Sequence, residues 1–106
     1  MTVNATVLYP TEADATFDLD YYLKTHMPLV SKNWSKYGLK SWQVIQYQTA
    51  PDGSKPYNIG ALLTWESADG LKNALAGEEA ATVFGDVPNF SNKSPIFIAG
   101  DIVGTS

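Results

Sequence analysis

The sequence predicts an α+β protein of the ferredoxin-like type, in which a four-stranded antiparallel sheet carries its helices on one face. The first observation is the order of patterns along the chain, which runs strand, helix, strand, strand, helix, strand. The second is the length of 106 residues, which indicates one domain spanning residues 1–106. The third is a composition with 44% hydrophobic and 17% charged residues, which is ordinary for a globular protein.

The first half of the chain begins with a strand and continues with one long helix. Residues 2–9 alternate loosely, with Val3, Ala5, Val7 and Tyr9 on one side, and this period of two is typical of a strand. Asp18 is the predicted N-cap of a helix that runs to about Tyr37, and the glycine that follows is its stop. Pro28 lies inside this helix and predicts a kink or break near residues 25–27. The predicted apolar stripe of the helix consists of Leu19, Tyr22, Leu23, His26, Val30, Asn33 and Trp34.

The second half carries three strands and a second, interrupted helix. Proline and glycine in residues 51–54 are a strong turn signal, so the strands on either side form an antiparallel hairpin. Ser67 caps the second helix, and Gly77 interrupts it. The predicted elements are a strand over residues 39–49, a strand over 57–65, a helix from Ser67 with a further turn or two over 78–84, a loop over 85–92 and a strand over 95–103.

The helices cover one face of the predicted sheet and leave the other face without a partner in the chain. Trp42, Tyr47 and Trp65 are available for that second face. An apolar sheet face must be buried against another layer. We therefore expect a homodimer in which a second copy packs sheet on sheet, with twofold symmetry as the commonest arrangement.

Charge and composition exclude several function classes. With 11 acidic against 7 basic residues the chain carries a net charge of −4, whereas binding to a nucleic acid needs a basic surface. The absence of cysteine excludes disulfides, thiolate nucleophiles and cysteine metal sites. A single histidine leaves too few ligands for zinc, and no glycine-rich nucleotide motif is present, so we expect no cofactor.

Two features of the chain concern its location. The N-terminus lacks the charged start and long apolar run of a signal peptide. No apolar stretch approaches the roughly 20 residues that span a bilayer. We therefore expect a cytoplasmic protein with no membrane partner.

His26, the only histidine, is the first candidate for catalysis. The unperturbed pKa of imidazole lies near neutral pH, so this side chain suits a general acid or base. Tyr22 lies four residues earlier on the same helix face and is the second candidate. Asp20 is the third, as a carboxylate that would orient the imidazole, although six residues of helix correspond to about 9 Å of rise. The alternative for each residue is ordinary packing or helix stabilisation.

Large aromatic residues elsewhere are candidates for a substrate pocket, because ligand pockets are mostly apolar with a few polar groups. The loop over residues 86–92 is polar but carries Val87 and Phe90, and it is a candidate lid. The alternative is that each aromatic residue belongs to the core or to a dimer interface. The predicted substrate-binding residues are Trp34, Trp65, Phe84 and Phe90.

The segment Phe17–Val30 (FDLDYYLKTHMPLV) resembles the EthD family, small proteins of the dimeric α+β barrel superfamily. The resemblance extends upstream to residues 7–10, and downstream to residues 38–39, the loop 84–92 and Gly100–Asp101. It implies two ferredoxin-like protomers whose sheets close into one barrel. It also implies a pocket between the sheet and the helices of each protomer.

The resemblance also implies a range of activities. The family is named for an association with the degradation of a fuel ether by an oxygenase system. Relatives in the superfamily include cofactor-free monooxygenases that act on polycyclic aromatics, lactone isomerases and haem enzymes, and some EthD-like proteins occur in aromatic polyketide pathways. Haem ligation by His26 is therefore an alternative to a cofactor-free site, although the relatives that bind haem are usually larger.

Three hypotheses about function follow. The first is a small cofactor-independent enzyme in which His26 transfers a proton on an aromatic or polyketide-like substrate, leading to oxidation, dehydration or isomerisation in a catabolic or biosynthetic pathway. The second is a non-catalytic carrier that binds a hydrophobic metabolite for a partner oxygenase. The third is a structural subunit without a ligand, which a pocket smaller than about 300 Å³ would favour.

Overall fold

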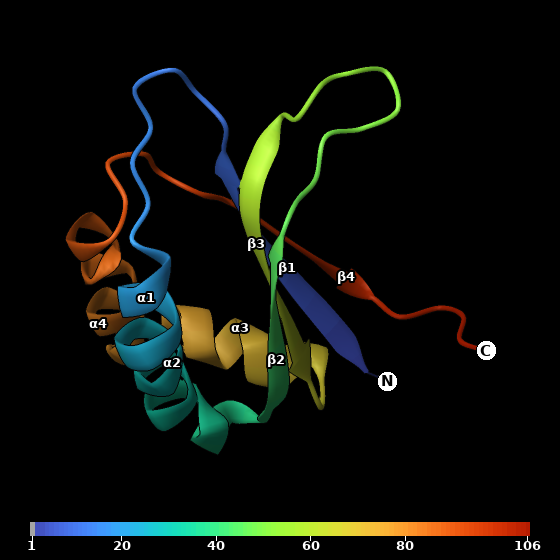
Figure 1. Ribbon diagram of the computed structural model, residues 1–106. Coiled ribbons are helices and arrows are strands. Elements are labelled where there is room, and N and C mark those ends of the chain that lie inside the picture. Colours follow the sequence, from blue (N-terminus) through green and yellow to red (C-terminus); the bar gives the residue numbers. More distant parts are fainter. Residues whose placement is uncertain (1) are drawn as a thin grey trace.

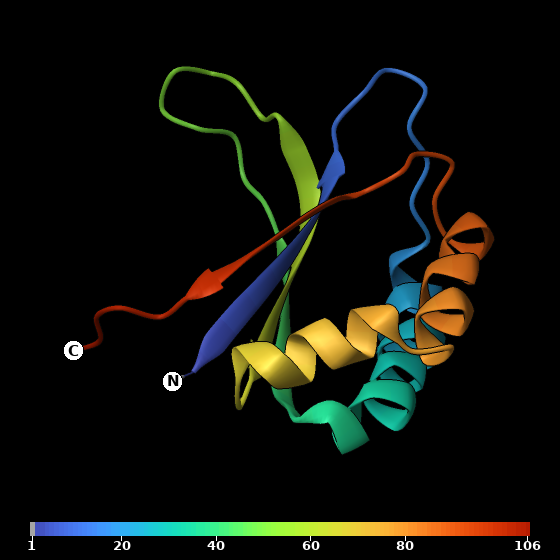
Figure 2. The same ribbon diagram turned by 180° about the vertical axis from the view of Figure 1, so that it is seen from behind.

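Four antiparallel strands in the order β2–β3–β1–β4 form a sheet, and the helices pack on one of its faces (Figure 1). The computed structural model describes residues 2–106. This strand order is that of the ferredoxin-like fold, so the predicted fold class is confirmed. Figure 2 shows that the connection between β2 and β3 projects at the end of the sheet away from the helices. The strands are β1 (Val3–Pro10), β2 (Leu39–Gln46), β3 (Tyr57–Trp65) and β4 (Ile96–Asp101).

The first helical segment runs from Leu19 to Tyr37 and joins β1 to β2. Its start is capped by Asp18, whose side chain accepts a hydrogen bond from the Tyr21 N–H at 3.0 Å. Its end is set by Gly38, which adopts a left-handed φ of 99° that favours glycine. Both predicted boundaries are confirmed. The segment consists of α1 (Leu19–Tyr21), the π-helical turn η1 (Tyr22–His26), α2 (Met27–Trp34) and the 3-10 turn η2 (Ser35–Tyr37).

The predicted break near Pro28 takes the form of η1. Proline has no N–H and cannot bond the carbonyl four residues earlier, which here belongs to Lys24. One residue before it, the Met27 N–H bonds the Tyr22 carbonyl five residues back. The wider turn advances the buried face of the helix by about one residue. Leu23, predicted in the apolar stripe, is therefore 39% exposed, whereas Met27 is only 1% exposed.

The second helical segment joins β3 to β4 and is interrupted at Gly77, as predicted. The Ser67 hydroxyl caps its start by accepting a hydrogen bond from the Gly70 N–H at 3.0 Å. Within residues 2–106, no helix has the length and apolar character needed to cross a membrane. The elements of this segment are α3 (Ala68–Ala76), α4 (Glu79–Gly85) and the 3-10 turn η3 (Val87–Asn89).

The core lies between the sheet and the helices. Along β1, buried and partly exposed residues alternate strictly, so one side of the strand faces the helices. The first helical segment packs its buried stripe against this side of the sheet. The core residues are Val3, Ala5, Val7, Tyr9, Leu39, Ile59, Ala61, Leu63 and Trp65 of the sheet, Tyr22, Met27, Val30, Trp34, Leu71, Ala74, Ala80 and Val83 of the helices, and Phe90 of the last loop.

The register of the sheet corrects the predicted outer face. Trp42 pairs with the core residue Leu63, so its side chain points to the helix side. Trp65 is itself a core residue and is completely buried. The prediction was wrong for these two tryptophans because the two-residue period of each strand has to be followed across the whole sheet. Tyr47 does lie on the outer face, where a Cβ added to Gly60 would come within 2.6 Å of its hydroxyl oxygen.

The outer face of the sheet carries both polar and apolar residues and is not covered by the helices. Its most exposed apolar residue is Ile98 of β4, at 54%. Thr6 pairs with Ile98 and Leu8 with Ile96, which places both isoleucines on the side opposite to the core. The apolar residues of this outer face are Leu8, Ile45, Leu62, Ile96 and Ile98.

Candidate functional site

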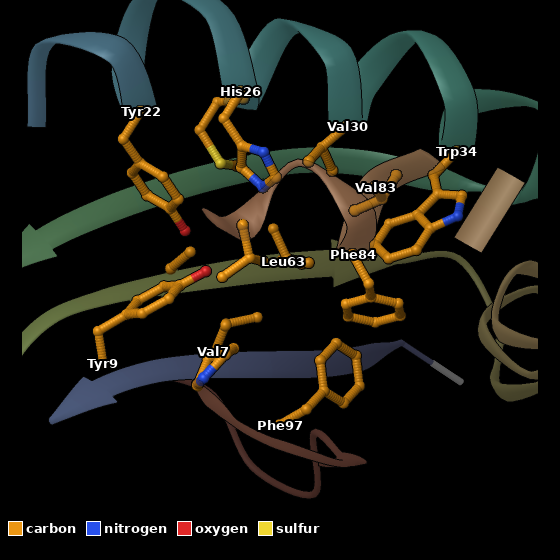
Figure 3. A pocket seen from close by; sticks show the side chains of 14 residues that line it. Val7, Tyr9, Tyr22, His26, Val30, Trp34, Leu63, Val83, Phe84 and Phe97 are labelled. Carbon is orange, nitrogen blue, oxygen red and sulfur yellow. The ribbon is translucent and has the colours of Figure 1, made fainter. Parts of the chain in front are cut away.

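A pocket lies between the sheet and the first helical segment, beside α4 (Figure 3). Most of the residues around it are apolar. Tyr9, Tyr22 and His26 bring polar atoms to it. The lining residues are Val7, Tyr9, Tyr22, His26, Met27, Val30, Trp34, Ala61, Leu63, Val83, Phe84, Val87, Pro95 and Phe97.

His26 comes from the π-helical turn and is buried. Its Nδ1 lies 2.9 Å from Oδ2 of Asp86. An ionised carboxylate only accepts hydrogen bonds, so Nδ1 carries the proton and donates it. The second ring nitrogen, Nε2, is then left with a free lone pair in the neutral imidazole. Figure 3 shows the imidazole edge of His26 directed into the pocket.

Asp86 reaches His26 from the loop that follows α4, and three donors surround its carboxylate. Tyr21 donates its hydroxyl to Oδ1 at 2.7 Å, and Asn89 donates its side-chain N–H to the same oxygen at 2.8 Å. His26 bonds Oδ2. Only 12% of the Asp86 side chain is exposed. Both carboxylate oxygens are therefore paired, as a carboxylate largely withdrawn from water must be to stay ionised.

The surroundings of these two groups favour a neutral imidazole and an ionised carboxylate. Burial lowers the pKa of His26 below its ordinary value of 6.5, and the hydrogen bond and charge of Asp86 offset this only in part. For Asp86, burial raises the pKa, but hydrogen bonds from Asn89, Tyr21 and His26 outweigh burial and hold the pKa below its usual range. At neutral pH His26 is thus a base with an available lone pair.

Two tyrosine hydroxyls lie close to the histidine. The Tyr22 ring stacks on the His26 ring, with centroids 5.2 Å apart and 13° between the planes. Tyr9 of β1 lies edge-on to Tyr22, and Figure 3 shows the two hydroxyls pointing toward one another. Burial raises the pKa of both Tyr9 and Tyr22, so both hydroxyls keep their protons and can donate hydrogen bonds.

The loop over residues 86–92, predicted as a lid, is tied to the start of the first helical segment. The Asp18 N–H donates to the Phe90 carbonyl at 2.8 Å, and the Thr16 N–H donates to Oδ1 of Asn92 at 2.8 Å. Phe90 is buried and packs on the imidazole ring with centroids 4.6 Å apart. The loop therefore supplies the Asp86 carboxylate and an aromatic ring that packs against the imidazole.

The pocket is narrow in this conformation. Its volume is about 20 Å³, which is room for about one water molecule. Phe84 is 40% exposed and packs against Trp34 and Phe97, with ring centroids 5.8 Å and 6.0 Å away. A ring-sized ligand does not fit in the pocket in this conformation.

A bound metal ion would need several donor side chains grouped at one place. Across residues 2–106, no three side chains of His, Cys, Asp or Glu come together in a group that could hold one.

Comparison with known proteins shows what this architecture is similar to. No family model and no curated protein matches the chain. A solved structure of an EthD-like protein from Ralstonia eutropha JMP134 is 21% identical, covers 99% of this chain and 95% of its own, and has a TM-score of 0.85. An ethyl tert-butyl ether D (EthD) family protein from Bacillus halodurans C-125 is also 21% identical, covers 97% of this chain and 100% of its own, and has a TM-score of 0.75. The chain has the fold of the EthD-like proteins.

The EthD resemblance inferred from the sequence is thus confirmed at the level of the fold. A dimeric ferredoxin-like protein of unknown function from Jannaschia sp. CCS1 is similar as well, with 15% identity, a TM-score of 0.66, and coverage of 96% of this chain and 100% of its own. Identities this low establish a shared fold, so the activity has to be argued from the site.

Within this EthD-like fold, the predicted catalytic residues do not all meet. His26 and Tyr22 stand together at the pocket. Asp20 lies on the outside of the helix, where its side chain is 80% exposed and pairs with Lys24 at 3.1 Å. The carboxylate that contacts the imidazole is Asp86 instead, because Asp20 starts from a different face of the helix.

Sequence reasoning missed Tyr21 and Asp86. Tyr21 lies one position before Tyr22 and therefore starts from a different part of the helix surface. The Asp86 carboxylate lies between Tyr21 and His26 and joins them. Asp86 follows His26 by 60 residues, so no local spacing connects them. The available signal was the loop itself, whose apolar Val87 and Phe90 indicate that this polar segment reaches the core.

The predicted substrate-binding residues also divide. Trp34 and Phe84 line the pocket. Trp65 packs against Trp34 with ring centroids 5.6 Å apart and is completely buried, so it supports that wall from within the core. Phe90 lies against the imidazole rather than in the pocket wall.

Proposed function

We propose that the protein is a small cofactor-independent enzyme in which His26 removes a proton from an aromatic or polyketide-like substrate. The observation that supports this most directly is the hydrogen bond of 2.9 Å between Nδ1 and Asp86, which leaves Nε2 free to accept a proton at an apolar pocket. A carboxylate behind a histidine fixes its tautomer and stabilises the imidazolium that forms when it acts as a base.

The proposed step is removal of an acidic C–H proton next to a carbonyl group. The C–H bond breaks, the proton goes to Nε2 of His26, and the electron pair moves onto the carbonyl oxygen to give an enolate. Asp86 stabilises the imidazolium. The hydroxyls of Tyr9 and Tyr22 donate hydrogen bonds to the enolate oxygen. Without a metal or flavin in the proposal, the substrate has to form a stabilised carbanion.

Three outcomes are open to that enolate. Return of the proton to a different carbon gives isomerisation. Departure of a β-hydroxyl group, which takes the proton from His26 and leaves as water, gives dehydration. Reaction of the carbanion with molecular oxygen as a co-reactant gives oxidation. All three begin with the same proton transfer, which is the step that the site geometry supports.

A non-catalytic carrier is the second candidate, and the apolar pocket wall favours it because a hydrophobic metabolite destined for a partner oxygenase needs no more than that. A structural subunit is the third, favoured by the pocket volume of about 20 Å³. Neither accounts for a buried histidine beside a paired carboxylate, since apolar packing of similar volume would be at least as stable.

Deuterium exchange tests the proposal without knowledge of the natural substrate. 2-Indanone, a bicyclic ketone with acidic C–H bonds, is incubated with the protein in D₂O, and loss of its proton NMR signal is followed. We expect faster exchange than with the same concentration of free imidazole. In the His26→Ala variant the rate should fall by about 10²–10⁴-fold.

Tyr37→Phe is the matched control for this assay, because it removes another tyrosine hydroxyl that donates to a carboxylate, at Glu79, away from the pocket. Its exchange rate should equal that of the wild type. Binding of 2-indanone without exchange would replace the enzyme proposal with the carrier, and neither binding nor exchange would favour the structural subunit.

We also propose that a second copy of the chain covers the outer face of the sheet. Ile96 and Ile98 are the large apolar residues left most exposed there, and one of the similar solved structures is described as dimeric. Ile98→Lys should convert a dimer into a monomer in size-exclusion chromatography with light scattering. Leu75→Lys, at an exposed apolar position on a helix, is the control that should leave the dimer intact.

A further inference from the structure

Tyr21 binds the carboxylate that orients the histidine, but it does not line the pocket. Its hydroxyl donates to Oδ1 of Asp86 at 2.7 Å, the shortest of the three hydrogen bonds to that carboxylate. Its ring stacks against Phe90, with centroids 6.1 Å apart and 26° between the planes. The hydroxyl is therefore aimed at Asp86 by packing on one side and by the helix on the other.

The three donors to Asp86 compete for one negative charge. Tyr21 and Asn89 share Oδ1, while His26 bonds Oδ2. Each hydrogen bond to a carboxylate stabilises the anion and reduces the electrostatic stabilisation that the carboxylate gives to a neighbouring cation. If His26 were the sole donor, the full charge of Asp86 would act on the imidazole and favour its protonated form.

We propose that Tyr21 is a positioning residue that acts through Asp86: its hydroxyl shares the negative charge of that carboxylate, so that the imidazole stays neutral with its Nε2 lone pair toward the pocket. The proposal rests on the function proposed above, in which His26 is a base. Asn89 supports the same oxygen with its side-chain amide N–H at 2.8 Å. Tyr21 is not a catalytic residue, since it has no contact with the pocket.

The other groups around the imidazole do not explain its neutrality by charge. Tyr22 stacks on it from its own helical turn, Tyr9 lies beyond Tyr22 on β1, and Phe90 packs on it from the last loop. Both tyrosines keep their protons because burial raises their pKa values. Among residues 2–106, the charge that acts on the pKa of His26 is that of Asp86 alone.

Because His26 is the only histidine, its pKa can be measured directly from the imidazole signals in an NMR titration of the whole protein. In Tyr21→Phe the ring still stacks on Phe90 but the hydroxyl is gone, so we expect the pKa of His26 to rise by roughly 0.5–1 unit. Asn89→Ala removes the other donor to Oδ1 and should give a rise in the same direction. Tyr37→Phe should leave the pKa unchanged, as the matched control.

A pKa of His26 that is unchanged or lower in Tyr21→Phe overturns the proposal. Should Tyr21→Phe fail to fold, Asn89→Ala decides the sign, because its side chain is exposed and its removal leaves the packing in place. The 2-indanone exchange assay separates this result from the proposed function. A raised pKa of His26 in Tyr21→Phe without any exchange by the wild type supports the role of Tyr21 and rejects the enzyme. Exchange that depends on His26, together with an unchanged pKa in Tyr21→Phe, supports the enzyme and rejects the role of Tyr21.

Discussion

Two tyrosine–carboxylate pairs join the first helical segment to α4 and its following loop, one near each end of α4. Tyr21 donates to Asp86 at 2.7 Å, and Tyr37 donates to Glu79 at 2.8 Å. The two pairs have the same chemistry and nearly the same length. They differ in the third partner, which is a buried histidine in one and an exposed lysine in the other, whereas the two carboxylates are buried to a similar extent. We refer to them as the Asp86 cluster (Tyr21, His26, Asp86 and Asn89) and the Glu79 cluster (Lys36, Tyr37 and Glu79).

The third partner decides what each cluster can do. In the Glu79 cluster it is a lysine whose side chain is 60% exposed, which remains charged and clamps two helical elements together. The hydrogen bonds from Lys36 and Tyr37 lower the pKa of Glu79 to about 2. In the Asp86 cluster the third partner is a buried imidazole, for which the neutral form is favoured. The same kind of hydrogen bond thus belongs to a clamp beside an exposed lysine in one cluster and to the support of a buried base in the other.

Removing the carboxylate from each cluster should give the largest difference between them. In Asp86→Ala, the Nδ1–H of His26 and the hydroxyl of Tyr21 lose their acceptor, which should cost about 1–3 kcal/mol of unfolding free energy. The 2-indanone exchange rate should fall by about 10²–10⁴-fold, because the base loses its orientation. Urea unfolding followed by tryptophan fluorescence measures the first quantity.

Glu79→Ala is the matched variant at the other end of α4. It should lower the unfolding free energy by less than Asp86→Ala and leave the exchange rate unchanged, since its partners remain in contact with water. Equal losses of stability and exchange in the two variants would show that the clusters do not differ in the way described.

Gly70→Ala should damage the Glu79 end of the structure alone. A Cβ at Gly70 would come within 2.1 Å of the main-chain carbonyl oxygen of Tyr37. Backbone cannot move aside as a side chain can, so we expect a loss of about 1–3 kcal/mol in urea unfolding. At Gly77 the Cβ would meet the hydroxyl of Tyr37 at 2.6 Å and an oxygen of Glu79 at 3.0 Å, which can rotate away. Gly77→Ala should therefore cost less.

Neither glycine variant should change the pKa of His26, because each acts at the far end of α4 from Asp86. A shifted His26 titration in a folded Gly70→Ala protein would mean that the two ends of α4 are mechanically coupled.

The two clusters should lose their contributions to stability in different pH ranges. The folded pKa of His26 lies below 6.5, so the unfolded chain binds the proton first as the pH falls. The contribution of neutral His26 is therefore complete above about pH 6.5 and is lost as the pH falls through the folded pKa. For Glu79 the ordinary value is 4.5 and the folded value about 2, so its contribution is complete above pH 4.5 and is lost toward pH 2.

Unfolding free energies measured in urea from neutral pH downward test this separation. His26→Gln should lack the loss of unfolding free energy that begins near pH 6.5 in the wild type. Glu79→Gln should lack the further loss that begins near pH 4.5. If the stability of the wild type and of His26→Gln falls in parallel between neutral pH and pH 5, His26 is not held neutral by the fold.

The features predicted correctly from the sequence are those that a few neighbouring residues determine. Asp18 and Ser67 cap helices through their own side chains, and Gly38 ends one because only glycine readily adopts its φ. Pro28 predicts a break in the helix because proline has no N–H to bond the carbonyl four residues earlier. The burial of other residues depends on a longer stretch of the chain. Leu23 is exposed, although predicted in the apolar stripe, because the π-helical turn advances the buried face of the helix.

The candidate site follows the same division. His26 and Tyr22 could be paired from their spacing of four residues on one helix. The carboxylate that contacts His26 could not be identified from spacing. Asp86 reaches the imidazole only when α4 packs on α2 and the loop after α4 is tied back to the start of the first helical segment. A spacing argument along the helix therefore selected Asp20, the nearest carboxylate in sequence, in place of the nearest one in space.

Asp20→Asn should have the smallest effect of all, and it tests that distinction directly. Asp20 pairs only with Lys24 on the exposed side of the helix, so the pKa of His26 and the exchange rate should match the wild type. A slight loss of stability is expected because a negative charge leaves the first turn of the helix. Asp86→Asn makes the same change of carboxylate to amide at the contacting position, and there the pKa of His26 should fall further because the opposing charge is removed. Equal shifts of the His26 pKa in the two variants would mean that Asp20 influences the imidazole as much as Asp86 does. A shift in Asp86→Asn alone shows that contact in space, rather than closeness along the helix, sets the protonation state of the imidazole.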